Sequence, residues 1–562
     1  MIHPLRCLAL AFGALLLACA AQADSSAAAK QAAVDALFAD YDHVTTPGLG
    51  LSIYQGGHEI YARGYGMANL ETGTVNTPRT VFHVASVSKQ FTAFSILLLA
   101  RDGKLKLDDD IRKYLPYVPD FGHKITINHL IHHTSGLRDQ WTLFDLGGVE
   151  DGSRRRQTQV VNMVSRQRAL NSVPGTEFNY CNTGYTLLAE IVKAVSGQTL
   201  RQFTTERIFK PLHMDRMFFY DDATEVVPER AQSYDKNDSG GWSREILSLS
   251  TVGATSLHTT ASDFAKWANN FARPTVGDKA LIDRFTTMGQ LDDGSPINYG
   301  FALMRKKVFG HEAVMHTGSD AGYRSIFAYF PREDFAVAIL ANTPMENEKL
   351  MQRIVEIYLG KQADETLKPV PAAVAGDEWT KVLPGKYQDP ASRDDLDIVV
   401  ADGKVGIEGW RGEIKPLVFR ADGTFDVGDE DRAKGRFYRL VRDAKGAVRA
   451  IEEGNASDYG RVGRYVRLQP VNAAQVNLRE LAGDYRSVEL DATYTVSVKD
   501  GELLVNSIWF DRPVSLKPLV KDGFTAPWPI GYVEVKRGAG GRPAALLLTT
   551  SRARNIRFDR VP

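Results

Sequence analysis

An internal repeat in the last third of the chain limits its possible folds more than any other feature. Leu383–Tyr387 (LPGKY) recurs as Leu481–Tyr485 (LAGDY), and the string KPLV occurs twice, first at residues 415–418. Short strand patterns and turn residues fill both copies. Each copy of roughly 90 residues is long enough to close one small antiparallel barrel. We therefore predict two tandem lipocalin-like β-barrels, at residues 379–470 and 471–562.

The region before the repeat has a different pattern, which mixes helices with strands. Two β-type runs joined by Gly56-Gly57 predict a hairpin near its start, and three further strand-like runs lie near its end. Apolar residues recur at helical spacing over 86–100 and 182–195. The pattern predicts an α/β (α+β) domain at residues 24–362, in which helices flank an antiparallel sheet. A linker with two prolines, residues 363–378, would join this domain to the repeats.

The first 23 residues have the pattern of a secretory signal peptide. Arg6 precedes a short apolar run, and Ala21-Gln22-Ala23 matches the small-x-small cleavage pattern. We expect an exported protein, periplasmic or secreted, that is cleaved after Ala23. A second interpretation stays open, in which a lipoprotein-type site anchors the protein through Cys19. No other segment is long and apolar enough to cross a membrane.

Composition removes several classes of function. The 68 Lys and Arg residues balance 68 Asp and Glu residues, so no bulk field attracts nucleic acid or an anionic membrane. The 26 Phe, 21 Tyr and 7 Trp residues can build sizeable cores, which excludes disorder over most of the length. With Cys7 and Cys19 in the signal region, Cys181 is the one cysteine left, and the sequence predicts no disulfide framework.

The string Ser86-Val-Ser-Lys89 opens a predicted buried helix. Residues three apart share a helical face, so the Lys89 amine can reach the Ser86 hydroxyl. A desolvated lysine can take the serine proton or orient another base. The N–H groups at the start of a helix also favour the charge that develops on an attacked carbonyl. The alternative is a helix cap beside a surface lysine, which the apolar flank disfavours.

The string Tyr180-Cys181-Asn182 lies just before a second predicted helix. In extended backbone, residues i and i+2 point to the same side, so Tyr180 and Asn182 would face together and Cys181 would face away. The phenol could then move protons for Ser86, and the amide could hold Lys89 and a substrate carbonyl. The alternative is a helix N-cap at Asn182 beside a core tyrosine.

The string His316-Thr317-Gly318 follows a strand-like run. On an edge strand, the missing side chain of Gly318 would let a substrate backbone approach closely. The N–H of Ser319 could complete an oxyanion hole with that of Ser86. His316 could offer a donor or a partial charge to a carboxylate. The alternative is a strand end with turn residues.

Together, the three strings resemble the motifs of the penicillin-recognising serine hydrolases, which include class C β-lactamases, DD-peptidases, D-aminopeptidases and related esterases. Leu130–Leu137 (LIHHTSGL) also looks like a structural motif of that family. The resemblance covers about residues 27–360 and implies a β-lactamase/transpeptidase-like fold. Many β-lactamases carry Lys where this sequence has His316. The His-Thr-Gly form is similar to certain DD-peptidases and D-aminopeptidases, and such D-aminopeptidases resemble a hydrolase domain followed by two barrels.

The resemblance implies acyl transfer, in which Ser86 attacks a carbonyl while Lys89 and Tyr180 handle the proton. No cofactor is implied, and the substrate would be a small molecule or a short peptide. The added barrels are expected to restrict access to the cleft. The predicted catalytic residues are Ser86, Lys89 and Tyr180, and the predicted substrate-binding residues are Asn182, His316, Thr317, Gly318 and Ser319.

The predicted function is an exported serine hydrolase, either a D-aminopeptidase/DD-peptidase-like amidase or a related esterase. Two alternatives stay open: a class C-type β-lactamase, and a non-catalytic penicillin-binding sensor or scaffold. His129, His132 and His133 have the spacing of a metal pair, but no His-Glu-x-x-His string accompanies them, so we predict no metal site. The Gly-x-Ser-x-Gly string of another hydrolase class is absent from the sequence. The sequence does not indicate the oligomeric state.

Overall fold

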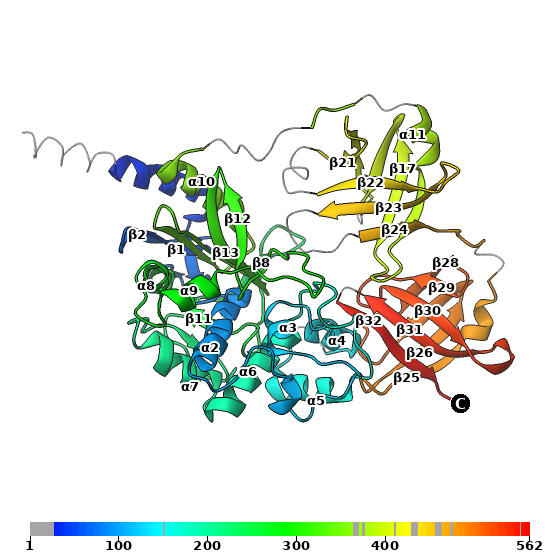
Figure 1. Cartoon of the computed structure of the whole chain (residues 1–562), viewed down its shortest axis with the longest axis horizontal. Helices are drawn as coiled ribbons and strands as arrows, with labels where there is room; N and C mark the ends of the chain where they lie inside the picture. The colour runs from blue at the N-terminus through cyan, green and yellow to red at the C-terminus, as the bar shows by residue number, and fades with distance from the viewer. Residues whose placement is uncertain are drawn as a thin grey trace, which may run out of the picture.

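A computed structural model gives the fold of the chain in three parts (Figure 1). It describes residues 27–149, 152–362, 370–373, 377–409, 412–428, 436–455, 463–472, 476–550 and 552–562. The predicted signal peptide and most of the predicted linker lie outside these residues. Within the described part, no helix is long and apolar enough to span a bilayer.

A six-stranded antiparallel sheet forms the centre of the first part, with the strand order β12-β13-β14-β15-β1-β2. The predicted hairpin is confirmed, because the two strands on either side of the glycine pair are hydrogen-bonded to each other. The later strands then pair with the first of these, which brings both ends of the domain into one sheet. The strands are β1 (Leu49–Gln55), β2 (His58–Tyr65), β12 (Met304–Val308), β13 (His311–Asp320), β14 (Tyr323–Phe330) and β15 (Phe335–Ala341).

Helices cover both faces of this sheet, and the alternation of side chains along β15 shows why. All seven residues of β15 are buried. Val337 and Ile339 belong to the core that includes Ile354 of α10 (Asn347–Leu359), whereas Ala338 belongs to the core that includes Trp267 of α8 (Ala261–Ala272). Because successive side chains of a strand point to opposite faces, a continuous apolar strand of this kind requires a cover on each side.

The remaining helices form a lobe beside the sheet, and the active-site strings lie at the starts of two of them. The 3-10 helix η2 (Ala85–Ser88) runs directly into α2 (Lys89–Arg101), which packs against α6 (Asn182–Ser196). Eleven residues of α2 are buried, so this helix is the centre of the lobe. The other helices are α3 (Ile127–Ile131), α4 (Gln140–Leu146), α5 (Gln157–Arg166), α7 (Leu200–Thr204) and α9 (Lys279–Phe285).

Short strands connect the lobe to the sheet and form several two- and three-stranded sheets. They are β3 (Met67–Asn69), β4 (Thr74–Val75), β5 (Phe82–His83), β6 (Arg155–Arg156), β7 (Phe218–Phe219), β8 (Tyr234–Lys236), β9 (Trp242–Arg244), β10 (Leu249–Ser250) and β11 (Leu257–Thr259).

The two repeat copies are both antiparallel β structures, as predicted. The second copy closes fully as an eight-stranded barrel, β25 to β32. The first copy is a nine-stranded, nearly closed barrel, β16 to β24, preceded by α11 (Asp377–Val382). The repeated string makes the same contact in each copy: Tyr387 Oη donates to the carbonyl of Leu383 at 2.8 Å, and Tyr485 Oη donates to that of Leu481 at 2.9 Å.

The strands of the first copy are β16 (Gly385–Gln388), β17 (Asp395–Ala401), β18 (Lys404–Glu408), β19 (Ile414–Pro416), β20 (Val418–Phe419), β21 (Phe425–Asp426), β22 (Arg436–Arg442), β23 (Val448–Asn455) and β24 (Gly463–Arg467). Those of the second copy are β25 (Gly483–Ser487), β26 (Ala492–Lys499), β27 (Glu502–Asn506), β28 (Val514–Val520), β29 (Gly523–Thr525), β30 (Tyr532–Arg537), β31 (Pro543–Thr550) and β32 (Ala553–Arg560).

The two barrels differ in how they meet the first part of the chain. The apolar residues of the second barrel join the core of the helical lobe, whereas those of the first barrel form a core of their own. Arg138, whose side chain is fully buried, pairs with Glu489 of the second barrel and donates to the carbonyl of Arg554 at 2.9 Å. Tyr494 Oη donates to the carbonyl of Leu146 at 2.7 Å. The second barrel is therefore docked on the lobe through both apolar and buried polar contacts.

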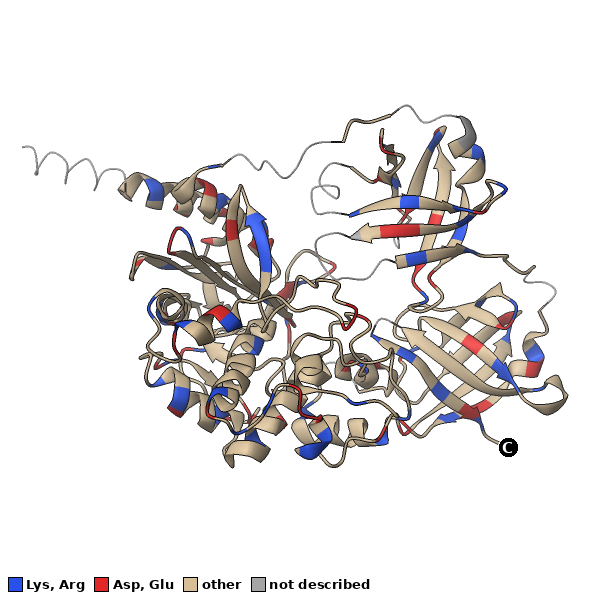
Figure 2. Cartoon of the chain, viewed as in Figure 1, with Lys and Arg blue, Asp and Glu red and all other residues tan. Residues whose placement is uncertain are grey.

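Charged residues of both signs are interspersed along all three parts of the chain (Figure 2).

Candidate active site

Lys89 and Ser86 are brought together at the junction of η2 and α2. Lys89 Nζ donates to Ser86 Oγ at 3.0 Å, to Asn182 Oδ1 at 2.9 Å and to the carbonyl of Ala254 at 2.7 Å. The Lys89 side chain is fully buried. Burial disfavours the ammonium form and lowers the pKa of Lys89 to about 7, although the charge of Asp139 opposes the shift. An amine with this pKa is neutral in a large fraction of molecules at neutral pH and can accept the serine proton.

Asn182 is fixed by a carboxylate that the sequence did not identify. Asp139 Oδ2 accepts from the backbone N–H of Asn182 at 2.6 Å and from its Nδ2 at 2.8 Å. With Nδ2 held there, Oδ1 faces Lys89. Asp139 is itself fully buried and caps α4 by accepting from the backbone N–H of Trp141. A buried network with all its members hydrogen-bonded holds the lysine in one position.

Tyr180 lies over the same amine, as the two-residue spacing predicts. Cys181 has extended backbone, with φ −132° and ψ 110°, so Tyr180 and Asn182 lie on one side of the chain. Lys89 Nζ is 4.9 Å from the centroid of the Tyr180 ring, and the His133 ring packs against that ring at 4.2 Å. Tyr180 therefore stands beside the Ser86–Lys89 pair.

The alternative nucleophile and the alternative metal site are not supported by their geometry. The Cys181 thiol is buried and donates to the carbonyl of Leu137 at 3.3 Å, and burial raises its pKa to about 12. The ring of His132 packs in a T-shaped arrangement with Phe301, whereas His133 Nδ1 accepts from the N–H of Cys181. No group of three or more His, Cys, Asp or Glu residues placed to bind a metal occurs in the described part of the chain.

His316 is placed beside the site but is not positioned to pair with a substrate carboxylate. Its side chain is buried, with Nε2 at 3.0 Å from Tyr299 Oη and Nδ1 at 2.6 Å from the carbonyl of Thr317. Burial, together with the charge of Lys89, lowers the pKa of His316 to about 3, so the ring is neutral at physiological pH. The contact with a substrate carboxylate, as a donor or through a partial charge, stays a prediction for this buried ring.

Gly318 allows a close contact inside the protein. A Cβ at this position would lie 2.5 Å from the carbonyl oxygen of Val84 and 2.4 Å from Ser325 Oγ. The missing side chain thus lets β13 pack against the segment that carries Ser86, and its expected contact with a substrate stays a prediction. Thr317 pairs with Ile326 in the sheet, and Ser319 follows Gly318 into the cavity described next.

A cavity of about 180 Å³ opens at Ser86 and contains four of the predicted site residues. Its lining is mixed in charge, with one carboxylate and two guanidinium groups. It is lined by Ser86, Trp141, Arg155, Tyr180, Asn182, Thr255, Ser319, Asp320 and Arg552. Lys89 lies behind this lining, where it reaches Ser86 and not the solvent.

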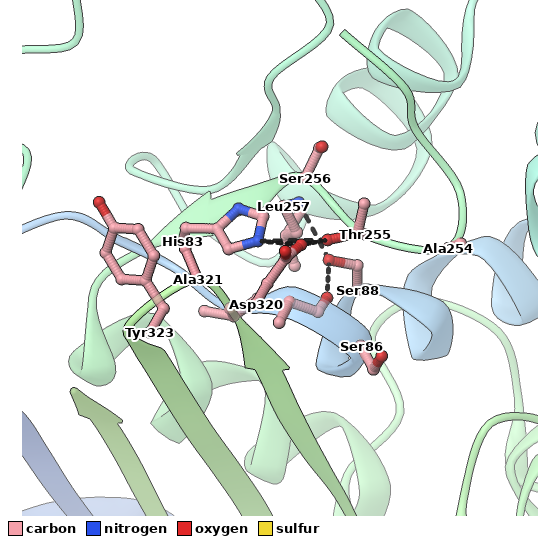
Figure 3. Close-up of polar contacts among 12 residues, drawn as sticks. His83, Ser86, Ser88, Ala254, Thr255, Ser256, Leu257, Asp320, Ala321 and Tyr323 are labelled. Carbon is pink, nitrogen blue, oxygen red and sulfur yellow. Dashed lines mark hydrogen bonds and ion pairs between the residues drawn. The ribbon is translucent and has the colours of Figure 1, made fainter. Parts of the chain in front are cut away.

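Asp320 is the carboxylate of the cavity, and it directly follows Ser319. Its Oδ2 accepts from Thr255 Oγ1 at 2.9 Å and lies 3.1 Å from His83 Nε2 (Figure 3). Burial alone would raise the pKa of Asp320, but the hydrogen bonds from His83 and Thr255 lower it below its ordinary value. Its Oδ1 has no hydrogen-bond partner among the described residues. An ionised oxygen is therefore available beside the nucleophile.

Arg552 comes from the turn between β31 and β32 of the second barrel. Its Nη1 donates to the carbonyl of Tyr180 at 3.4 Å and lies 3.7 Å from Asp139 Oδ2. Its guanidinium also lies 5.5 Å from the centroid of the Tyr180 ring. The barrel thus contributes a cation to the wall of the cavity. No local pattern could have identified Arg552, whereas Asp320 could have been found by extending the His-Thr-Gly string by two residues.

Residues 34–359 match the family described as Beta-lactamase. The chain is 26% identical to the D-aminopeptidase of Gluconobacter oxydans (strain 621H), over 96% of this chain and the whole of that relative. A solved structure of SurE is 25% identical, with a TM-score of 0.54, and covers 79% of this chain and 100% of that one. An octameric penicillin-binding protein homologue from Pyrococcus abyssi has a TM-score of 0.53 at 20% identity, over 85% of this chain and 98% of that one.

Proposed function

The chain belongs to the β-lactamase family and is a D-aminopeptidase-like hydrolase. From that premise we propose that it releases an N-terminal D-amino acid from short peptides or amides through an acyl-enzyme on Ser86. The observation that carries the mechanism is the contact of Lys89 Nζ with Ser86 Oγ at 3.0 Å, made by an amine whose pKa is near 7. The full-length similarity to a D-aminopeptidase, with both barrels included, supports the substrate class.

In the proposed reaction, Ser86 Oγ attacks the carbonyl carbon and its proton passes to Lys89. The N–H groups of Ser86 and Ser319 would hold the oxyanion. The C–N bond then breaks, and the leaving amine takes a proton through Tyr180. Water attacks the carbonyl carbon of the resulting ester, and the bond from that carbon to Ser86 Oγ breaks. The acid leaves, and the proton from water returns along the same route to restore the serine hydroxyl.

Asp320 supports recognition of a free amine. An N-terminal ammonium group next to the attacked carbonyl would meet the ionised Oδ1, while Oδ2 stays with Thr255 and His83. This assignment separates an aminopeptidase from an esterase, because an acetyl ester has no ammonium group to bind.

We predict that Asp320→Asn raises KM about tenfold or more for D-alanine p-nitroanilide, the typical loss when a charged hydrogen bond is removed. Asparagine keeps an oxygen for Thr255, so the loop should stay folded. The KM for p-nitrophenyl acetate should not change. Steady-state kinetics on both substrates check this, and an equal change for the two substrates would contradict the ammonium role.

Arg552 favours a second candidate, a DD-peptidase that binds a terminal carboxylate. Its guanidinium lies on the cavity wall beside Tyr180. N-acetyl-D-alanyl-D-alanine carries that carboxylate and no free amine, so its turnover, compared with that of D-alanine p-nitroanilide, distinguishes the two candidates. If the DD-peptidase is correct, Arg552→Gln should abolish most of the dipeptide turnover while ester hydrolysis continues. Nitrocefin in the same panel tests the β-lactamase alternative.

The nucleophile has its own test. A fluorophosphonate probe should add one phosphonyl group to the peptide that contains Ser86, and Ser86→Ala should lose the label while its circular dichroism spectrum is unchanged. A label found on Cys181, or one that persists in Ser86→Ala, would contradict the acyl-enzyme.

Export is also part of the proposal, on the pattern of the first 23 residues. Mass spectrometry of the protein purified from cells should find Asp24 as the first residue. A lipid-modified Cys19 as the first residue would instead support the anchored form.

A further inference from the structure

A second cavity, of about 210 Å³, has His83 and Ser256 in its lining and shares no lining residue with the cavity at Ser86. In Figure 3, Ser86 and the Ser256 hydroxyl lie on opposite sides of the Asp320 carboxylate. His83 links the two cavities, since it lines the second one and contacts Asp320, which lines the first. Nothing in the proposed reaction uses this second cavity.

Two buried polar atoms on residues that line the second cavity have no partner among the described residues. They are His83 Nδ1 and Ser256 Oγ. Both side chains are about 1% exposed. Buried polar groups are nearly always hydrogen-bonded, so two unsatisfied atoms on one cavity wall indicate an occupant with polar groups of its own.

The rim of the cavity carries two guanidinium groups, from Arg230 and Arg244, and one carboxylate, from Glu245. Neither arginine forms an ion pair with a described residue; Arg230 lies 5.4 Å from the centroid of the Tyr220 ring. A water molecule could satisfy the two buried atoms, but it would not balance the excess positive charge. The charge excess favours an anion, and guanidinium groups suit the planar fork of a carboxylate.

We propose that this cavity is a binding site for a small carboxylic acid of amino-acid size. The carboxylate pairs with Arg230 and Arg244 and accepts a hydrogen bond from Ser256 Oγ. The apolar part of the ligand packs against Tyr220 and Leu249. A cavity of about 150 Å³ is large enough for benzene, so one of 210 Å³ accepts a molecule the size of a single amino acid.

The site stands apart from the catalytic cavity but is joined to it by one hydrogen-bonded group. His83 Nε2 contacts Asp320, and its Nδ1 is the atom left for the ligand. The ligand therefore lies one side chain away from the residue that we assign to ammonium binding, although its own binding does not depend on the reaction at Ser86.

Isothermal titration calorimetry with propionate, D-alanine and L-alanine tests the site. The wild-type protein is titrated in parallel with Arg552→Gln, which removes the guanidinium that the barrel contributes to the catalytic cavity. We expect saturable binding at one site per chain. Arg244→Gln, a change at an exposed side chain, should weaken the binding about tenfold or more. Ser256→Ala, which removes the donating hydroxyl, should weaken it by a similar factor. Arg305→Gln, at an exposed residue of β12, is the matched control and should change nothing.

Comparing the affinities for the three acids shows which class of carboxylic acid the site binds. Equal affinity for propionate and alanine assigns the site to carboxylic acids in general, and tighter binding of alanine assigns it to amino acids, with Glu245 holding the ammonium. The proposal is overturned if none of the three acids binds saturably. It is also overturned if wild-type binding is lost in Arg552→Gln but kept in Arg244→Gln, because the acid would then occupy the catalytic cavity.

Discussion

Two buried bases, Lys89 and His316, determine how the site responds to pH. Burial destabilises the charged form of both side chains and lowers the pKa of each. Because lysine has the higher ordinary pKa, the pKa of Lys89 falls to about 7 and that of His316 to about 3. The lysine therefore titrates in the working range, and the histidine does not.

We predict that kcat/KM for p-nitrophenyl acetate rises with pH through about 7 and falls tenfold per pH unit well below it. The reason is that the neutral amine of Lys89 is the active form, and its fraction falls as the group is protonated. No limb from His316 should appear between pH 5 and 8. A pH–rate profile, together with the rate of fluorophosphonate labelling at each pH, measures this.

A profile that is flat from pH 5.5 to 8 would contradict the assignment of Lys89 as the base. The control is Lys89→Arg, whose side chain stays protonated at these pH values and should show little activity at any of them.

Strand β13 connects the central sheet to the catalytic cavity. It pairs with β12 and β14, packs against η2, and delivers Ser319 and Asp320 to the catalytic cavity. Its close approach to η2 depends on Gly318, since a Cβ there would meet the carbonyl of Val84. The position of Asp320 relative to Ser86 therefore depends on a residue that has no side chain.

We predict that Gly318→Ala lowers the free energy of unfolding by about 1–3 kcal/mol, the usual cost of overpacking a tight site. It should also reduce kcat/KM, because β13 must move away from η2. Urea denaturation and ester kinetics measure the two effects. The double variant with Ser325→Ala should not recover, since the Val84 carbonyl stays in place; full recovery would show that the Ser325 hydroxyl alone requires the glycine.

Local patterns predicted much of the fold and part of the site. Helical periodicity identified α2 and α6 because their buried faces are continuous in sequence, and the repeat identified both barrels because each copy folds locally. Ser86, Tyr180 and Asn182 were predicted as site residues because each lies in a short string that can be recognised locally. Arg552 and Asp139 could not be found, since their roles arise from contacts between residues distant in sequence. The burial of His316 could not be deduced from a three-residue string.

At the scale of the whole molecule, the two copies of the repeat have different structural roles. The second barrel shares a core with the helical lobe, and the first does not. The expectation that both barrels act as a cover over the cleft becomes more specific: the second barrel supplies Arg552 to the cavity wall. Because it also covers an apolar surface of the lobe, we expect a chain that ends near Gly360 to aggregate.

We predict that Glu489→Ala destabilises the protein by about 3–5 kcal/mol, because it leaves the buried Arg138 guanidinium unpaired. The matched control is Glu534→Gln, which removes a partly exposed pair with Arg393 between the two barrels and should cost at most about 1 kcal/mol. Thermal unfolding measures both. Equal effects of the two variants would show that the barrel is not held through Arg138.

The origin of Arg552 has a consequence for the timing of synthesis. Ribosomes make chains from the N-terminus, so Ser86 and Lys89 emerge long before the β31–β32 turn. A nascent chain can fold its lobe, but its catalytic cavity lacks one wall until the second barrel has been made and has docked. Any protein whose translation stops before that turn carries the nucleophile and its base without the guanidinium. Because the lobe shares its core with the second barrel, a chain interrupted before that turn also leaves an apolar surface uncovered, so we expect it to aggregate before it can act on a substrate.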